Sequence, residues 1–426
     1  EGHIDSRCAV LCDTSCAAHG MEDNGSGTAL VVELARVMSK YSYNQTIVFI
    51  VTIGEEQGLY GANAFATYCQ QKSIIIKGVF NNDVIGGVMC GNTSSPPSCS
   101  PAGNIDSTSV RIFSYGTFNS FHKQLGRFSK LEYKEQLLPS VSVPMTIHIM
   151  SPEDRTGRSG DHVPFRQKNF TTIRFTSTNE HGNANVTSPT YTDRQHTSGD
   201  ILGVDTNSDM VIDSFFVDFN YLGRNAVING NAIGMAGIGP KTPDFTVVNA
   251  GGTNVLVTIT QGTQYLNYRV AIRTTTNDWD TLYAMVGTIS DTIDVGATGN
   301  HIFSVCSVDT NGIESLFSKE IQLNIGGSGI YELEKHEKIT LLQNKPNPFD
   351  IATTISVLVN DPVKYKSAQI LIRDMAGKEV KRLPITLTNG MNEVLYEHGY
   401  SYSGIYTYTL LIDGKPVQTK TMVFAN

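Results

Sequence analysis

Residues of the types that bind metal ions occur at five places in the first half of the chain. The stretches GHID, GMEDNGSG, IGEEQG, NND and YTDRQH supply the candidate residues, which are His3, Asp5, Asp23, Glu55, Glu56, Asp83 and His196. Each stretch lies at the end of an expected strand or at the start of an expected helix. In an open α/β sheet, side chains from different strands meet at the carboxyl edge. Imidazoles and carboxylates meeting there would suit two divalent cations, and the mixture of ligands favours zinc.

The adjacent carboxylates Glu55 and Glu56 are the most informative of these residues. They directly follow residues 46–54, an apolar run (TIVFIVTIG) that does nothing to accommodate charge. Buried carboxylates need partners, and metal ions are natural ones. Taken singly, the other residues have ordinary explanations, because Asp23 before a helix is typical of an N-cap and His196 in a Thr/Ser-rich loop is typical of a surface residue. The combination favours a metal site.

The elements that must position these residues alternate between strands and helices over residues 1–235. The apolar, β-branched run 46–54 predicts a strand buried on both faces of a sheet. Residues 27–41 have apolar side chains at helical spacing. Further segments are two buried strands and a closing amphipathic helix, expected at 74–86, 170–177 and 208–230. The pattern predicts an α/β domain with a mostly parallel or mixed sheet and helices on both faces.

The rest of the chain predicts two all-β sandwich domains. Residues 240–325 contain short runs of alternating polar and apolar residues, separated by polar turns. The sequence GGSG at 326–329 is expected to be a flexible joint. Residues 331–426 again contain only short strand-like runs.

Composition and cysteine content exclude some classes of protein. The net charge of −8 excludes a general nucleic-acid binder. No run approaches the ~18–20 apolar residues that span a bilayer. Cys90 and Cys99 flank a loop suited to a short disulfide bridge. For Cys8, Cys12 and Cys16, a local disulfide with one spare thiol is favoured over a soft-metal site. The pairing of the cysteines, which also include Cys69 and Cys306, stays open.

The ordered blocks H-x-D, G-x-x-DNGSG, GEEQGLYGA, NND, SGDHVPF and QHTSGD resemble the M28 family of zinc aminopeptidases over residues 1 to about 230. The resemblance implies a zinc-peptidase fold with two zinc ions. Asp23 would bridge both ions. His3 and Asp83 would complete one zinc site, and Glu56 and His196 the other. The chain begins two residues before His3, so we expect the strands that precede this histidine to be missing.

The same resemblance assigns roles to four further residues. Glu55 matches the general base, which takes a proton from a zinc-activated water. Asp5 matches the carboxylate that orients His3, and Asp161 and His162 match a block near the substrate cleft. The implied activity is release of N-terminal residues from peptide or protein substrates, with the free α-amino group anchored near one ion.

The tail has a second resemblance. LLQNKPNPF, RDMAGKEV and SGIYTYTLLIDGK resemble the C-terminal sorting domain of the type IX secretion system of Bacteroidetes, over residues 331–426. It implies export by the type IX machinery and a secreted, extracellular or cell-surface protein. Residues 240–325 resemble a fibronectin type III-like domain only by strand rhythm and position, and we interpret them as a spacer in preference to a substrate-binding domain.

Other functions on the same scaffold stay open. A glutaminyl cyclase of this type generally uses one zinc, whereas His3 and Asp83 together favour two; a carboxypeptidase is a further alternative. A non-enzymatic surface or adhesion protein is the third, and the intact Glu55 argues against it. Side-chain specificity, metal identity, the native N-terminus and oligomeric state are not readable from the sequence.

Overall fold

The computed structural model describes most of the chain. The described ranges are 1–90, 104–154, 158–178, 194–274, 278–325, 339–359, 365–374, 377–398 and 403–425. Contacts divide the chain into two compact units, residues 1–327 and residues 328–426, and each is described by itself. The expected Cys90–Cys99 bridge and the joint at 326–329 involve residues that lie outside the described ranges.

The sheet of the α/β part is mixed. Four strands have the order β3-β6-β4-β5, with β3 parallel to β6, β4 parallel to β5, and β4 antiparallel to β6. A separate parallel pair is formed by β1 and β2. Glu1 connects the two groups, because its carbonyl accepts from Asn82 N at 2.8 Å and its amine donates to Phe80 O at 2.9 Å. Glu1 is thus hydrogen-bonded to two residues of β3, Phe80 and Asn82, as a residue in a parallel pair of strands is. The strand β1 therefore lies beside β3 and continues the sheet. The strands are β1 Gly2–His3, β2 Val51–Thr52, β3 Val79–Asn82, β4 Ser109–Phe113, β5 Thr146–Ile149 and β6 Thr172–Ser177.

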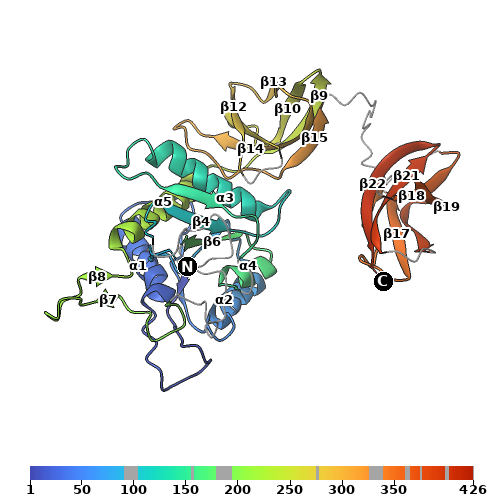
Figure 1. Ribbon diagram of the computed structural model, residues 1–426. Helices are drawn as coiled ribbons and strands as arrows, with labels where there is room; N and C mark the ends of the chain where they lie inside the picture. The colour runs from blue at the N-terminus through green and yellow to red at the C-terminus, as the bar shows by residue number, and fades with distance from the viewer. Residues whose placement is uncertain are drawn as a thin grey trace. The chain divides into compact units, whose positions relative to one another are not determined.

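Helices pack against both faces of this sheet (Figure 1). They are α1 Gly27–Met38, α2 Tyr60–Gln71, α3 Phe121–Glu132, α4 His162–Gln167 and α5 Phe219–Ile238, with π-helical turns η1 Met21–Ser26 and η2 Tyr133–Leu137. Neighbouring residues of β3 show the two faces, since successive side chains of a strand point to opposite sides. Phe80 packs in the core that includes Leu30 of α1 and Phe128 of α3. Val79 packs instead with Ala62 of α2 and Phe165 of α4.

The apolar run 46–54 is less buried than we expect from the sequence. Only Val51–Thr52 forms a strand, and the side chains of Val48 and Ile53 are 60% and 69% exposed. Thr52, in contrast, is 4% exposed. The prediction of burial on both faces is therefore wrong. Within the described residues β2 pairs only with β1, so its other edge and one of its faces are not covered.

The closing helix begins later than the periodicity predicts. The sequence predicts a helix over residues 208–230, but α5 starts at Phe219. The carboxylate of Asp218 accepts a hydrogen bond from Tyr221 N at 2.8 Å and so caps the N-terminus of this helix. Ahead of it, Asp205 accepts from several backbone amides, including Met210 N at 2.6 Å. These bonds stabilise a turn in place of a helix. The turn connects the short hairpin strands β7 Gly203–Val204 and β8 Ser214–Phe215, labelled in Figure 1.

Residues 244–325 form a sandwich of a three-stranded and a four-stranded sheet. The sheet orders are β13-β10-β9 and β12-β11-β14-β15. Val255, Val257 and Phe303 are among the side chains buried between them. The strands are β9 Asp244–Gly251, β10 Asn254–Gln261, β11 Asn267–Arg273, β12 Thr281–Val286, β13 Ser290–Asp294, β14 Gly299–Val308 and β15 Ile321–Ile325.

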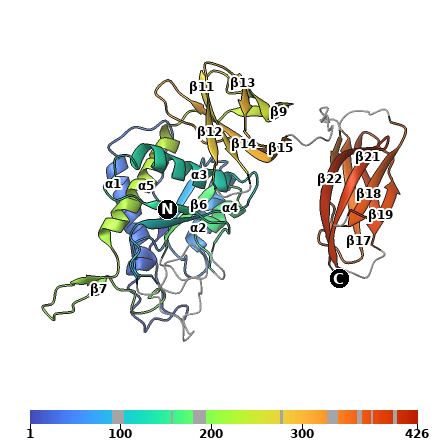
Figure 2. The same ribbon diagram turned by 45° about the horizontal axis from the view of Figure 1, so that its top comes forward.

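This sandwich packs firmly against the α/β part, and Figure 2 shows its strands beside α3. Cys306 and Phe317 belong to the same hydrophobic core as Phe128 of α3. The buried carboxylate of Glu320 binds Arg127 of α3 at 2.9 Å and Arg273 of the sandwich at 2.7 Å. The sandwich thus shares a core with the α/β part, and its role as a spacer stays a prediction.

Loss of the Glu320 charge should destabilise the first unit. We expect Glu320→Gln to lower the free energy of unfolding by about 3–5 kcal/mol, because it leaves two buried guanidinium groups without a full counter-charge. The one tryptophan of the chain, Trp279, packs against Phe317 at this junction with its ring tilted by 44°, so its fluorescence reports denaturation there. As a control, Glu379→Gln breaks an exposed pair in the second unit and should leave the tryptophan transition in place. A Glu320→Gln transition at the wild-type denaturant concentration would contradict the prediction.

The second unit is another sandwich. Its sheets have the orders β16-β17-β20 and β19-β18-β21-β22, and Ile355, Tyr396 and Leu410 are in its core. The strands are β16 Ile339–Leu341, β17 Ala352–Val359, β18 Ala368–Asp374, β19 Glu379–Pro384, β20 Gly390–Glu397, β21 Gly404–Ile412 and β22 Lys415–Phe424. Across the described ranges, no helix combines the length and hydrophobicity needed to cross a bilayer.

Candidate metal centre

The five candidate ligands form two groups of three that share Asp23. In the first group, Nε2 of His3 lies 3.3 Å from Asp23 Oδ1 and 3.5 Å from Asp83 Oδ1. In the second, Nε2 of His196 lies 3.1 Å from Asp23 Oδ2 and 3.1 Å from Glu56 Oε2. We call these groups the His3 trio and the His196 trio. Within each, the candidate ligand atoms all lie within 4.8 Å of one another.

Three adjacent strands bring the trios together. His3 ends β1, Asp83 follows β3, and Glu56 follows the segment after β2. Because these strands are parallel neighbours, their carboxyl ends meet at one edge of the sheet. Asp23 reaches the same edge from the turn that precedes α1, and His196 comes from a distant loop.

The donor atoms suit cations. Nε2 of His3 and Oε1 of Glu56 are buried and have no hydrogen-bond partner within the described chain. Buried polar atoms without a partner are costly, and a bound cation would satisfy both. Each trio offers one imidazole nitrogen and two carboxylates, a donor set that zinc accepts in catalytic sites with a further position left open. The residues present therefore fit two zinc ions.

Asp200 holds Asp23 in place, a role that none of the sequence motifs indicates. Its two carboxylate oxygens accept from Glu22 N at 2.9 Å and from Asp23 N at 3.0 Å. The only sequence signal for this role is its position four residues after His196 in the QHTSGD block. The turn is also fixed by Gly27, where an added Cβ would lie 2.2 Å from the backbone oxygen of Asn82. Any larger residue at position 27 would collide with the strand that leads to Asp83.

Asp200→Asn should weaken zinc binding by about 10–100-fold, the usual cost of losing a group that orients a metal ligand. An amide can accept from only one of the two backbone N–H groups and would turn its NH₂ toward the other. Competition with a chromophoric chelator measures the change. Asp209→Asn, in the exposed turn 205–213, is the matched control and should bind zinc as the wild type does. Equal affinity in both variants would exclude the role assigned to Asp200.

Asp5 supports both His3 and the two glutamates. Its backbone carbonyl accepts from Nδ1 of His3 at 3.0 Å, which fixes the proton on Nδ1 and leaves Nε2 for a cation. Its carboxylate lies farther from Nδ1, at 3.7 Å. That carboxylate instead accepts from Glu55 N at 3.2 Å and Glu56 N at 3.1 Å. Orientation of His3 therefore comes chiefly from the Asp5 carbonyl, while the side chain holds the turn that carries both glutamates.

Glu55 has the features of a general base. Its side chain is partly buried, and its carboxylate makes no hydrogen bond to any described residue. Burial raises the pKa of Glu55 well above its usual value; the positive charge of His3 opposes this, while the carboxylates of Asp83 and Glu56 add to it. A base whose pKa is shifted toward neutrality can both take and return a proton.

His3 is strongly influenced by its carboxylate neighbours. Burial by itself lowers the pKa of His3, but the nearby carboxylates of Asp23, Asp5 and Asp83 outweigh it, so this pKa lies well above its usual value. A cation that binds Nε2 must displace a proton from this ring.

Zinc affinity and the stability of the metal-free protein should respond to pH in opposite directions. The raised pKa of His3 stabilises the folded metal-free protein below its unfolded pKa of about 6.5, and this contribution is lost as pH rises through the folded value. Zinc affinity should increase over the same range, because fewer protons compete for Nε2. Thermal melting of chelator-treated protein and zinc competition between pH 6 and 9 test both trends. An affinity independent of pH would contradict this account of His3.

Asp161 and His162 lie beside the metal centre, next to Asp83, but they are buried. Both side chains are 0% exposed. Asp161 accepts a hydrogen bond from the Thr52 hydroxyl, and Nε2 of His162 lies 3.2 Å from the carbonyl of Glu153. Neither has surface from which to touch a substrate in this structure. They support β2 and the segment around Glu153, which corrects their interpretation as substrate contacts.

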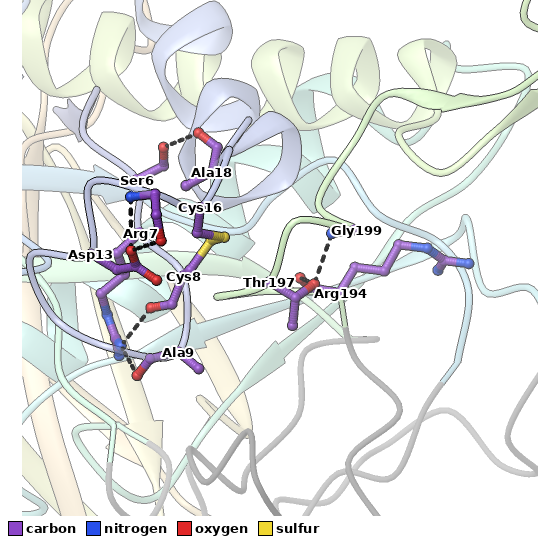
Figure 3. Close-up of a disulfide and its surroundings, with 11 residues drawn as sticks. Ser6, Arg7, Cys8, Ala9, Asp13, Cys16, Ala18, Arg194, Thr197 and Gly199 are labelled. Atoms are coloured by element: carbon purple, nitrogen blue, oxygen red, sulfur yellow. Dashed lines mark hydrogen bonds between the residues drawn. A yellow bond between two sulfur atoms is a disulfide. The ribbon is translucent and has the colours of Figure 1, made fainter.

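A disulfide closes a loop in the segment that follows His3 and Asp5, and Figure 3 shows this bond. Cys8 is bonded to Cys16, and Cys12 is free and exposed, which confirms the prediction of a local disulfide with one spare thiol. Cys69 and Cys306 are free and buried. Cys90 is disulfide-bonded.

Comparison with known proteins identifies related peptidases. Residues 1–211 match the family described as "Peptidase family M28". A probable zinc metalloprotease of Leptosphaeria maculans is 29% identical over 332 residues, covering 74% of this chain and 72% of the relative. Another, of Pyricularia oryzae, is 31% identical over 334 residues, covering 74% of this chain and 62% of the relative. The similarity thus extends beyond residue 211, and the chain spans less than two thirds of the second relative.

Solved structures add little. The dimeric latent PorU of Porphyromonas gingivalis is 15% identical, with coverage of 43% of this chain and 20% of that one and a TM-score of 0.20. A likeness at this level supports no conclusion about fold or function.

Proposed function

We propose that this chain, whose residues 1–211 match peptidase family M28, is a two-zinc aminopeptidase of that family. The single observation that carries the proposal is the position of Asp23, which presents one carboxylate oxygen to each of two histidine-containing trios. One bridging carboxylate between two complete ligand sets is the arrangement that a pair of metal ions needs. His3 and Asp83 would hold one ion, and Glu56 and His196 the other.

Zinc ions bound there would act as Lewis acids on water and on the scissile carbonyl. Residues of the chain would supply proton transfer and the positioning of the reacting groups. Glu55 would take the proton of the attacking water and deliver it to the leaving amine. Its raised pKa suits this task, because the same group must act as a base and then as an acid. Asp5 fixes the backbone of Glu55 and Glu56, which keeps the base and the ligand in separate positions.

The proposed preference for a free N-terminus concerns the α-amino group of the substrate. We propose that this amino group is anchored near one of the two ions held by Asp23, Glu56, Asp83 and the two histidines. An acetylated N-terminus carries an amide there in place of the amine and would lose that anchor. The test uses one peptide in free and N-acetylated forms. We expect release of the first residue from the free form only, and internal cleavage of the blocked peptide would make the enzyme an endopeptidase.

The alternatives on this scaffold have less support. A one-zinc cyclase would need one trio, and here both trios are complete. A non-enzymatic adhesion protein would have no use for Glu55 beside them. A peptide with N-terminal glutamine separates these cases, because a cyclase would form a pyroglutamyl product of unchanged length, while an aminopeptidase would shorten the peptide.

We also propose that residues 331–426 direct export by the type IX secretion machinery, and that the protein acts outside the cell or at its surface. The sequence blocks of the tail support this. The described residues from 339 onward have a hydrophobic core of their own. A separate core is compatible with an export signal that can be cleaved from the rest of the chain. The three-plus-four strand arrangement likewise supports a fibronectin type III-like origin for the first sandwich. Fusing residues 328–426 to a fluorescent reporter tests the export proposal. The reporter should leave wild-type cells of a type IX-secreting bacterium but stay inside a secretion mutant, and retention in both strains would refute the assignment.

A further inference from the structure

Arg7 places a positive charge inside the His196 trio. Its Nε donates to Glu56 Oε2 at 2.8 Å, and its Nη2 lies 2.9 Å from Nδ1 of His196. The glutamate oxygen that it binds is the one that also lies 3.1 Å from Nε2 of His196. One guanidinium thus contacts two of the three members of this trio, through the Glu56 oxygen that faces His196, while Oε1 of the same carboxylate has no hydrogen-bond partner among the described residues.

The other trio is also next to an arginine, but the contact differs. Arg174 lies 3.0 Å from Oδ2 of Asp83, whereas Oδ1 of Asp83 faces His3. Arg174 also binds Asp154 at 2.7 Å, so its charge is shared with a carboxylate outside the trio. Arg174 therefore supports Asp83 through the oxygen that the His3 trio does not use.

The contact with His196 adds a second conflict. A guanidinium has only donors, so Nδ1 of His196 must accept from Arg7 and cannot carry a proton there. A histidine that binds metal through Nε2 normally carries its proton on Nδ1 and donates it to a neighbour, as His3 does to the carbonyl of Asp5. Arg7 and a metal ion therefore make opposing demands on His196 as well as on Glu56.

The disulfide loop holds Arg7 in this position. Its Nη1 donates to the carbonyls of Cys8 at 3.2 Å and Ala9 at 3.4 Å, the first residues of the loop that the Cys8–Cys16 bond closes (Figure 3). The other end of the loop is fixed by a hydrogen bond from the Ser6 hydroxyl to Ala18 O at 2.8 Å. The arginine is therefore attached to a short closed loop at the edge of the site.

From these contacts we infer that Arg7 competes with the metal ion of the His196 trio, so that the His3 trio fills first and the His196 trio fills second, with lower affinity. The inference rests on the proposed two-metal function. It makes the second ion the one that regulates the enzyme, because the doubly loaded form would appear only when free zinc is high enough to displace Arg7 from Glu56 and His196.

Stepwise zinc binding tests this directly. The full chain is stripped with a chelator and titrated with zinc against a chromophoric competitor. The wild type should bind two ions in two resolved steps. Arg7→Gln should tighten the second step by roughly tenfold or more, since a unit positive charge is removed from the ligands, and leave the first step within about threefold. Arg7→Lys keeps the positive charge but loses the paired contacts with Glu56 and His196. Its affinity for the second ion should lie between those of the wild type and Arg7→Gln.

Arg36→Gln is the matched control. It removes the same charge from an exposed pair with Glu33 on α1 and should change neither step. If the wild type binds two ions but Arg7→Gln binds the second ion no more tightly than the wild type does, this inference alone is overturned. Weaker binding of the second ion by Arg7→Gln would mean that Arg7 supports the metal ligands. Binding of fewer than two ions by the wild type would overturn the proposed function together with the inference.

Discussion

Glu55→Gln should reduce kcat for N-terminal residue release by about 10²–10⁴-fold, the usual contribution of a positioned general base. The amide keeps the size of the side chain but cannot take a proton. Glu55 belongs to neither trio, so the variant should keep its zinc content. Steady-state kinetics on a peptide with a free N-terminus, combined with metal analysis of the same sample, measures both quantities.

The matched control is Glu33→Gln, on the exposed side of α1, which should turn over substrate as the wild type does. Two results would count against the assignment. Wild-type turnover in Glu55→Gln would mean that another group accepts the proton. A loss of zinc in parallel with activity would mean that Glu55 is a ligand.

Asp23→Asn should have the largest effect on metal content. Asp23 is the one residue that both trios share, so removing its charge weakens both sites at once. We expect zinc to fall from about two ions per chain to near zero after dialysis, with activity at background. Asp83→Asn affects the His3 trio only and should leave more zinc bound than Asp23→Asn does. Elemental analysis after dialysis measures the difference, and retention of two ions by Asp23→Asn would refute the bridging role.

The candidate ligands could be predicted from the sequence because their signal is local. Glu55 and Glu56 follow an apolar run, and Asp23 and Asp83 lie in short blocks at expected element ends. The carboxyl ends of parallel strands meet whatever the details of packing. The start of α1 at Gly27 could also be predicted, because the helical spacing of apolar residues that indicates this helix lies within the helix itself.

The features that escaped prediction depend on contacts between distant parts of the chain. Asp200 binds the amides of residues more than 170 positions away, and Glu320 meets Arg127 across 193 positions. Arg7 looks like an ordinary loop residue until its side chain is placed against His196. No periodicity reports such contacts, because they arise from the tertiary fold. The exposure of Ile53 has the same origin, since burial of a strand depends on neighbours that its own sequence does not specify.

Anomalous scattering at the zinc edge, on crystals of the zinc-loaded protein, tests the central claim most directly. We expect two zinc peaks roughly 3.5–4 Å apart, as in other two-metal sites. One peak should lie between His3 and Asp83, the other between Glu56 and His196, with a carboxylate oxygen of Asp23 directed at each. A single peak, or peaks bound by other residues, would contradict it.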